Sequence, residues 1–356
     1  MWIKKLKINN FRNYIEQEIN FKENINVFYG ENAQGKTNII EAIYLCSMGK
    51  SFRTQKDKEL INSNFENAVI EIEFEKSDRE GKIKIQLNNK KNIYLNSIKL
   101  KKLSELLGNI NTVIFTPEDI DILKGGPQNR RKFLDVMISQ LRPNYLHILN
   151  LYLKTLEQRN NYLRQIKEEN KDENMLEIWD EKLAEYANKI YLYREEFIEK
   201  IKNKIKLIHS EITENKEEIK IEYLSDCKNK EEYLNLLKNR RKLDIIKGFT
   251  TKGIHRDDFM VYINGKEINI FGSQGQHRTV VLSLKLSELN IIYDEIGEYP
   301  ILLLDDFMSE LDSKRRKSFL ENIKNTQVII TCTEKINIEN LNYLEYNVCD
   351  GHVLKK

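Results

Sequence analysis

The chain has 356 residues, 40% of them hydrophobic and 32% charged. This length can bury a large core in one large domain or in a domain plus a long appendage. No apolar run approaches the roughly 20 residues that cross a bilayer, so a transmembrane helix is not expected. The net charge of +3 is too small to indicate a polyanionic partner by itself. The four cysteines lie far apart, which argues against disulfides or zinc and favours a cytoplasmic location.

The start of the chain, MWIKKLKINNF, is typical of a strand and carries no signal-peptide core. The next motif in chain order is a phosphate-binding loop within NVFYGENAQGKTNIIEAIYL (26–45). Its glycines let backbone N–H groups approach phosphate oxygens, while Lys36 can reach the terminal phosphates and Thr37 can bind Mg²⁺. A chance glycine-rich turn is the alternative. It is disfavoured because an apolar strand leads directly into the loop and a helix follows it directly. The predicted ATP contacts are Gly30, Glu31, Asn32, Ala33, Gln34, Gly35, Lys36, Thr37 and Asn38.

Residues 68–96 alternate apolar and polar side chains around turn signals, which predicts an antiparallel meander. Basic residues cluster beside it, after the Gly-Gly-Pro at 125–127, and near residue 240. Such clusters can neutralise nucleic-acid phosphates without reading sequence, or can simply be solvated faces. The candidate DNA contacts are Lys101, Lys102, Arg130, Arg131, Arg240 and Arg241.

The middle of the chain is predicted to be mainly helical. Residues 144–247 contain neither glycine nor proline, and apolar residues recur in them at helical spacing. The stretch KEENKDEN (167–174) indicates a polar tip between two long helices. Because IKIEYL (219–224) alternates like a strand, the helical insert is expected to end near residue 216.

A second anion-binding loop is indicated late in the chain. The segment 259–271 predicts a hairpin about Asn264-Gly265, and FGSQGQHRT (271–279) then runs into an apolar helix at 277–292. One chain cannot easily fold both loops around one triphosphate, but two copies packed head to tail could share each nucleotide. A plain turn between hairpin and helix is the alternative. His277 is either a helix-start residue or a functional one. His255 and Arg256 either lie near the dimer face or the arm, or form a structural hydrogen-bonding unit.

Two carboxylates follow a buried strand in PILLLDD (300–306). Asp305 is predicted to hold the metal ion of the nucleotide site, and Asp306 to orient or deprotonate the attacking water. A solvated turn is the alternative, which the phosphate-binding loop makes less attractive because such a loop requires this pair. Ser309 and Asp312 follow at the same end of the strand, and QVIITCT (327–333) predicts another buried strand.

In their order, these motifs resemble the ABC-type ATPase heads of the SMC class. The rest of the chain resembles the RecF family within that class, through LKINNFRNY (6–14), VIFTPEDIDILKGGPQNRRKFLD (113–135) and GIHRDDF (253–259). The resemblance spans essentially the whole chain. It implies an α/β fold: an ABC-type head with mixed and antiparallel sheets, formed by residues 1–143 and 217–356, with a helical arm inserted at 144–216.

The resemblance also implies a mechanism. The signature residues of one head contact the γ-phosphate held by the other, so ATP makes a homodimer and hydrolysis releases it; these residues are Ser273, Gln274, Gly275 and Gln276. Lys36, Asp306 and Ser273 then form the catalytic set, Arg12 and Asn13 lie near the nucleotide, and Glu118 marks the Q-loop. The expected partners are double-stranded and gapped DNA and the mediators RecR and RecO.

Two departures from many ABC-type heads suggest slow turnover. Asp306 stands where a longer glutamate is common, and Thr331 and Thr333 stand where a switch histidine is usual. The predicted function is that of a DNA-stimulated ATPase, switched by ATP, that acts in gap repair and recombinase loading. Two other functions stay open. One is an ATPase that energises a membrane transporter, and the other is a scaffold in which ATP is only structural.

Overall fold

The computed structural model describes the chain except for residues 78, 308–318, 320–322, 324, 336–342 and 356. It contains two compact units. Unit 1 comprises Met1–Asp119 and Lys285–Lys356, and unit 2 comprises Ile120–Leu284. The chain therefore passes between the units twice, at 119/120 and at 284/285.

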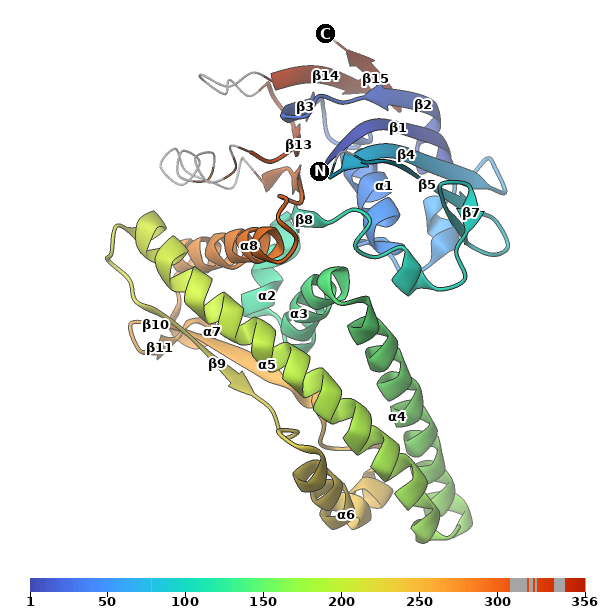
Figure 1. Cartoon of the computed structure of the whole chain (residues 1–356), viewed down its shortest axis with the longest axis vertical. Helices are drawn as coiled ribbons and strands as arrows, with labels where there is room; N and C mark the ends of the chain where they lie inside the picture. The colour runs from blue at the N-terminus through green and yellow to red at the C-terminus, as the bar shows by residue number, and fades with distance from the viewer. Residues whose placement is uncertain (78, 308–318, 320–322, 324, 336–342, 356) are drawn as a thin grey trace. The chain divides into compact units, whose positions relative to one another are not determined.

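Unit 1 contains a largely parallel sheet with the strand order β15-β14-β3-β13-β12-β8 (Figure 1). Its strands are β3 (Ile25–Tyr29), β8 (Thr112–Phe115), β12 (Ile301–Asp305), β13 (Val328–Cys332), β14 (Tyr343–Cys349) and β15 (His352–Lys355). Only β15 pairs in the antiparallel sense. Every residue of β3, β12 and β13 is buried. For β12 and β13 this confirms the prediction that their apolar runs are strands covered on both faces.

The second sheet of unit 1 is antiparallel, in the order β2-β1-β4-β5-β6-β7. Its strands are β1 (Trp2–Phe11), β2 (Tyr14–Asn20), β4 (Ala68–Lys76), β5 (Arg79–Leu87), β6 (Asn92–Leu95) and β7 (Ile98–Lys99). The predicted meander over 68–96 is confirmed as β4, β5 and β6. Helix α1 (Lys36–Met48) packs against β4 and β5 of this sheet and against β12 and β13 of the other, so the core of unit 1 surrounds α1.

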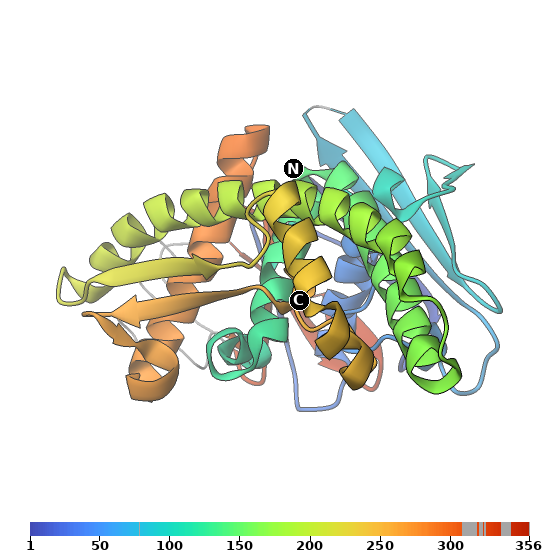
Figure 2. The same ribbon diagram turned by 90° about the horizontal axis from the view of Figure 1, so that it is seen from below.

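Unit 2 is built on two long helices, α4 (Pro143–Glu169) and α5 (Glu177–Thr213), as the missing glycine and proline predicted. The polar tip between them includes the short helix η4 (Glu173–Leu176), and the insert ends close to the expected residue. The other elements of the unit are α2 (Asp121–Lys124), α3 (Pro127–Leu141), β9 (Ile219–Leu224), α6 (Lys230–Lys247), η5 (Ile254–Arg256), β10 (Asp258–Ile263), β11 (Lys266–Glu267) and α7 (Ile268–Phe271). Strands β9 and β10 run side by side (Figure 2).

The region of the second anion loop differs from the prediction in two ways. The hairpin turns at Asn264-Gly265, both with positive φ, but its second strand has two residues and the following INIF forms the helical turn α7. Helix α8 (Gln274–Ile296) begins three residues before the expected start. The division into a head and an arm at 144–216 stays a prediction. None of the described helices is long and apolar enough to cross a membrane.

Candidate active site

The phosphate-binding loop connects the end of β3 to the start of α1, as predicted. Gly35 precedes the helix with φ of 112°, and a Cβ added there would lie 2.7 Å from the Asn13 side chain. A Cβ on Gly30 would lie 2.3 Å from the carbonyl oxygen of Val348. Close approach therefore requires glycine at both ends of the loop.

The Lys36 ammonium is held at this loop. Its Nζ donates to the carbonyl oxygens of Gly30 at 2.7 Å and Glu31 at 2.8 Å, and only 4% of the residue is exposed. The first turn of α1 contains no acidic residue, so the positive end of the helix dipole is not neutralised there. The loop, the helix end and the lysine together suit a polyphosphate.

The carboxylate strand meets this loop because β3, β13 and β12 are adjacent and parallel. Asp305 Oδ1 accepts hydrogen bonds from Thr37 Oγ1 at 2.9 Å and from Thr331 Oγ1 at 2.7 Å. Thr331 Oγ1 in turn accepts from the Asp306 N–H at 3.0 Å. Burial raises the pKa of Asp305, opposed by the two hydroxyl bonds and by the charge of Arg53. A hydroxyl and a carboxylate in contact form the oxygen-rich donor set that Mg²⁺ prefers.

The turn between β1 and β2 holds the first residues of α1. Arg12, at φ of 54°, donates through Nε and Nη2 to both carboxylate oxygens of the fully buried Glu41. Asn13 Nδ2 donates to the Gln34 carbonyl at 2.9 Å, and its Oδ1 accepts from Asn38 Nδ2 at 2.8 Å. Arg12 thus anchors the turn, while Asn13 contacts the phosphate-binding loop directly.

Two further contacts near the phosphate-binding loop were not predicted from the sequence. Arg53 Nη1 donates to Asn38 Oδ1 at 2.9 Å, and its side chain is 42% exposed beside the start of α1. The Asp350-Gly351 turn between β14 and β15 donates its backbone N–H groups to Gln34, at 2.5 Å to Oε1 and 3.4 Å to the carbonyl. The Asp-Gly pair does signal a turn, but no local pattern relates it to a loop 316 residues away.

The signature loop forms a capping box at the start of α8. Ser273 Oγ accepts from the Gln276 N–H at 3.2 Å, and the Ser273 N–H donates to Gln276 Oε1 at 2.9 Å. Gln276 also donates to Glu217 at 2.9 Å. Ser273 and Gln274 are exposed, and Gly275 lies in the first helical turn. Beneath them the ring of buried His277 contacts the Ser273 carbonyl through Nδ1 at 2.7 Å, which gives this histidine a structural role.

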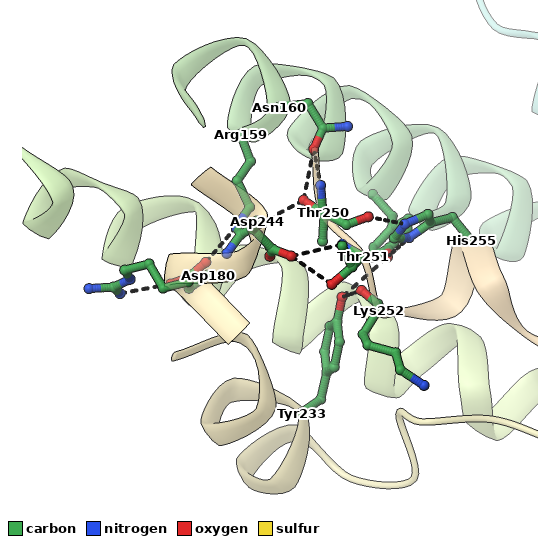
Figure 3. A network of polar contacts seen from close by, with 11 residues as sticks. Arg159, Asn160, Asp180, Tyr233, Asp244, Thr250, Thr251, Lys252 and His255 are labelled. Atoms are coloured by element: carbon green, nitrogen blue, oxygen red, sulfur yellow. Dashed lines mark hydrogen bonds and ion pairs between the residues drawn. The ribbon is translucent and has the colours of Figure 1, made fainter. Parts of the chain in front are cut away.

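His255 belongs to a buried polar network in unit 2 (Figure 3). Its Nε2 faces the Thr250 carbonyl at 3.1 Å and must donate to it, so Nδ1 accepts from the Tyr152 hydroxyl at 2.8 Å. Burial lowers the pKa of His255 to about 4, with the charge of Arg256 as a smaller cause. Of the two interpretations left open for His255, the structure supports a structural hydrogen-bonding unit.

Most of the arginines that were predicted to contact DNA bond instead to groups within the protein. The proposal for Arg130 is wrong: it is 4% exposed and binds both carboxylate oxygens of Asp258, at 2.6 and 2.9 Å. Arg131 donates to the Asp257 carbonyl at 2.6 Å, and Arg241 pairs with Asp180 at 2.9 Å. Arg240 is partly exposed, and Lys101 and Lys102 are exposed.

At the expected Q-loop position, Glu118 is exposed, while its neighbour Asp119 pairs with buried Lys285 at 3.5 Å. Ser309 and Asp312 lie outside the described residues.

Comparison with known proteins agrees with this geometry. Residues 2–348 match the family model described as the RecF/RecN/SMC N terminal domain. The phosphate-binding loop and its carboxylate strand, on this fold, are those of an SMC-class ATPase head. An Smc head domain from Pyrococcus furiosus shares the fold, with a TM-score of 0.58 and 17% identity over 100% of this chain and 96% of that one.

Closer relatives define the family. The chain is 45% identical over 354 residues to the DNA replication and repair protein RecF of Acetivibrio thermocellus, covering 96% of each protein. It is 47% identical over 355 residues to RecF of Clostridium perfringens, covering 98% of this chain and 96% of the relative. A solved structure described as the recombination mediator protein RecF with ATP in the RecFOR pathway has a TM-score of 0.94 and 42% identity, over 100% of this chain and 97% of that one. The chain therefore belongs to the RecF family of DNA replication and repair proteins, and these relatives give no support to the transporter alternative.

Proposed function

We propose that this chain binds and hydrolyses ATP and uses the nucleotide as a dimerisation switch in recombinational DNA repair and replication. Family membership supports the repair role, and the ATP in the solved relative supports the nucleotide. The observation that carries the proposal is the contact of Thr37 and Thr331 with one oxygen of Asp305, because it joins the phosphate-binding loop to the carboxylate strand.

The residues around this contact have separate roles in binding the nucleotide and in hydrolysing it. Backbone N–H groups of residues 30–38 and the Lys36 ammonium bind the phosphates, while Thr37 and Asp305 would hold Mg²⁺, which neutralises phosphate charge when bound. Asp306 orients or deprotonates the attacking water. Thr331 fixes the Asp305 carboxylate, to which it donates, and the Asp306 backbone, from whose N–H it accepts. The short Asp306 and the threonines at the usual histidine position favour slow turnover, used to time release rather than to do work.

The signature residues supply the switch. Ser273 Oγ accepts from a backbone N–H in its own capping box, so its hydroxyl hydrogen can be donated to the γ-phosphate held by a second copy. Gln274, Gly275 and Gln276 begin α8, whose N-terminus favours an anion. ATP then joins two copies, and hydrolysis separates them.

The partners follow from the family. The solved relative is named as a mediator of the RecFOR pathway, which favours RecR and RecO as partners of this chain and duplex or gapped DNA as its substrate. Stimulation of the ATPase by DNA, loading of recombinase at gaps and a cytoplasmic location belong to the same proposal.

Sedimentation velocity with ATP, ADP or no nucleotide tests the switch. Wild-type protein is expected to dimerise in ATP alone. Ser273→Arg should stay monomeric while binding ATP normally, because the bulky cation fills the place of the partner's nucleotide. Lys36→Ala is the matched control, which loses the dimer together with ATP binding. A dimer that forms equally in ADP, or a Ser273→Arg protein that dimerises like wild type, would refute the proposal.

A further inference from the structure

The lysines of the antiparallel sheet fall into two groups. Most on the outward face are neutralised by neighbouring carboxylates: Lys5 pairs with Glu18 at 2.6 Å, and Lys82 pairs with Glu71 at 2.6 Å. Towards the β7 edge of the sheet, lysines are in excess over carboxylates. Residues 81–104 contain seven lysines and no aspartate or glutamate.

Five of these seven lysines make no ion pair with any described residue. Lys82 is paired within the sheet, and Lys91 pairs with Asp57 at 2.8 Å. The remaining five are Lys84, Lys90, Lys99, Lys101 and Lys102, of which all but Lys84 are exposed. Like charges gathered without counter-charges repel one another, so this arrangement contributes nothing to the stability of the fold.

Strand register aligns part of this group around an aromatic ring. Lys84 on β5 lies directly opposite Tyr94 on β6, and Tyr94 lies directly opposite Lys99 on β7. Directly opposed residues of antiparallel strands share a face, so the tyrosine stands between two lysines. Strand β7 ends the sheet, and Lys101 and Lys102 follow it at once.

The other basic clusters keep less unpaired charge: only Lys132 in one and Arg240 and Lys242 in the other make neither an ion pair nor a side-chain hydrogen bond with any described residue. Arg130, Arg131 and Arg241 are bonded to acidic side chains or to carbonyl groups, and Lys238 pairs with Glu177 at 3.0 Å. Of the clusters recognised in the sequence, the one at the β7 edge keeps most of its charge available to an external ligand.

We propose that the lysine–tyrosine strip, formed by Lys84, Lys90, Tyr94, Lys99, Lys101 and Lys102, binds the sugar–phosphate backbone of double-stranded DNA. The proposal rests on the proposed DNA-binding function and gives that function a surface. Charge complementarity selects a polyanion, and ammonium groups contact phosphates without reading sequence. Five lysines to one aromatic ring favour a duplex over a single strand, because a single-strand site relies on several stacked bases.

Fluorescence anisotropy with a random-sequence duplex, in ATP and over a series of salt concentrations, tests the strip. The combined variant Lys99→Gln, Lys101→Gln, Lys102→Gln should bind at least about tenfold more weakly at moderate salt. Its plot of log affinity against log salt should be shallower by roughly 0.9 per lysine removed. The matched control, Lys5→Gln, Lys7→Gln, Lys82→Gln, removes lysines that are paired within the same sheet and should bind like wild type.

ATP binding and ATP-dependent dimerisation should be unchanged in both triple variants, which separates this surface from the nucleotide switch. If the wild type binds the duplex and the strip variant binds it equally well, the strip is not the site. If the strip variant loses single-stranded but not duplex binding, the assignment to a duplex is overturned. A wild type that binds no duplex refutes the DNA-binding part of the proposed function, and the strip falls with it.

Discussion

The buried hydroxyl of Thr331 connects the Asp305 carboxylate to the backbone of Asp306. It donates to Asp305 Oδ1 and accepts from the Asp306 N–H, and Asp306 adopts a φ of 48°, a left-handed conformation that is uncommon outside glycine. The hydroxyl thus links two consecutive residues at the carboxyl end of the neighbouring strand β12.

Thr331→Val should therefore slow ATP turnover by at least about tenfold, since Asp306 loses its anchor, while ATP binding changes by no more than a few-fold. Single-turnover hydrolysis and nucleotide titration measure the two effects separately. Thr326→Val is the control, because the buried Thr326 hydroxyl has no hydrogen-bond partner among the described residues and its loss should be neutral. Unchanged turnover in Thr331→Val would show that Asp306 is positioned without the hydroxyl.

At the scale of elements, the predictions were most accurate for segments whose residue pattern fits only one type of secondary structure. The apolar runs of β12 and β13 and the glycine-free span of α4 and α5 left one interpretation each. The pattern of INIF fits a strand or a helical turn, so it did not distinguish the predicted strand from α7, in which only Ile268 is buried. The early start of α8 was readable in the spacing of Ser273 and Gln276, which form the capping box.

In the active site, too, the sequence predicts only those contacts that a motif itself requires. A phosphate-binding loop requires a carboxylate partner, so the meeting of Thr37 with Asp305 could be predicted. The contacts of Arg53 with Asn38 and of Asp350 with Gln34 could not, because they depend on how distant segments pack and follow from no local spacing.

Helices α4, α5 and α6 are joined by one buried guanidinium. Arg159 on α4 is fully buried and binds Asp180 on α5 at 2.7 Å and Asp244 on α6 at 2.8 Å (Figure 3). Asp244 also accepts from the N–H and hydroxyl of Thr251, so the same carboxylate fixes the segment that leads to His255.

Asp244→Ala should lower the free energy of unfolding by about 3–5 kcal/mol, because it leaves a buried positive charge without its second counter-charge. Chemical denaturation measures this loss. Glu177→Ala removes the exposed partner of Lys238 between α5 and α6 and should cost less than about 1 kcal/mol. Equal losses in the two variants would show that the buried network is not what joins the helices.

At the scale of the whole molecule, no sequence pattern predicted that the chain passes between its units at 119/120 and 284/285. Both sites adjoin one buried charge cluster inside unit 1. Lys285 Nζ lies 3.5 Å from Asp119 and 3.5 Å from Glu288, and all three groups are largely buried. Burial raises the pKa of both carboxyl groups, against the opposing charge of Lys285. The cluster therefore ties together, within unit 1, the two segments through which the chain leaves it.

Lys285→Met should destabilise the protein by about 3–5 kcal/mol near neutral pH, because two buried carboxylates then lack a counter-charge. Without the lysine their folded-state pKa values rise further above the unfolded values. The folded state then binds protons more tightly, so the destabilisation should shrink as the pH falls through these raised pKa values. Unfolding free energies relative to wild type, at pH about 7 and about 5, measure the difference. Lys189→Met, which removes only an exposed pair with Glu185, should show no such dependence. A loss that is the same at both pH values would mean that Lys285 acts through its packing and not through its charge.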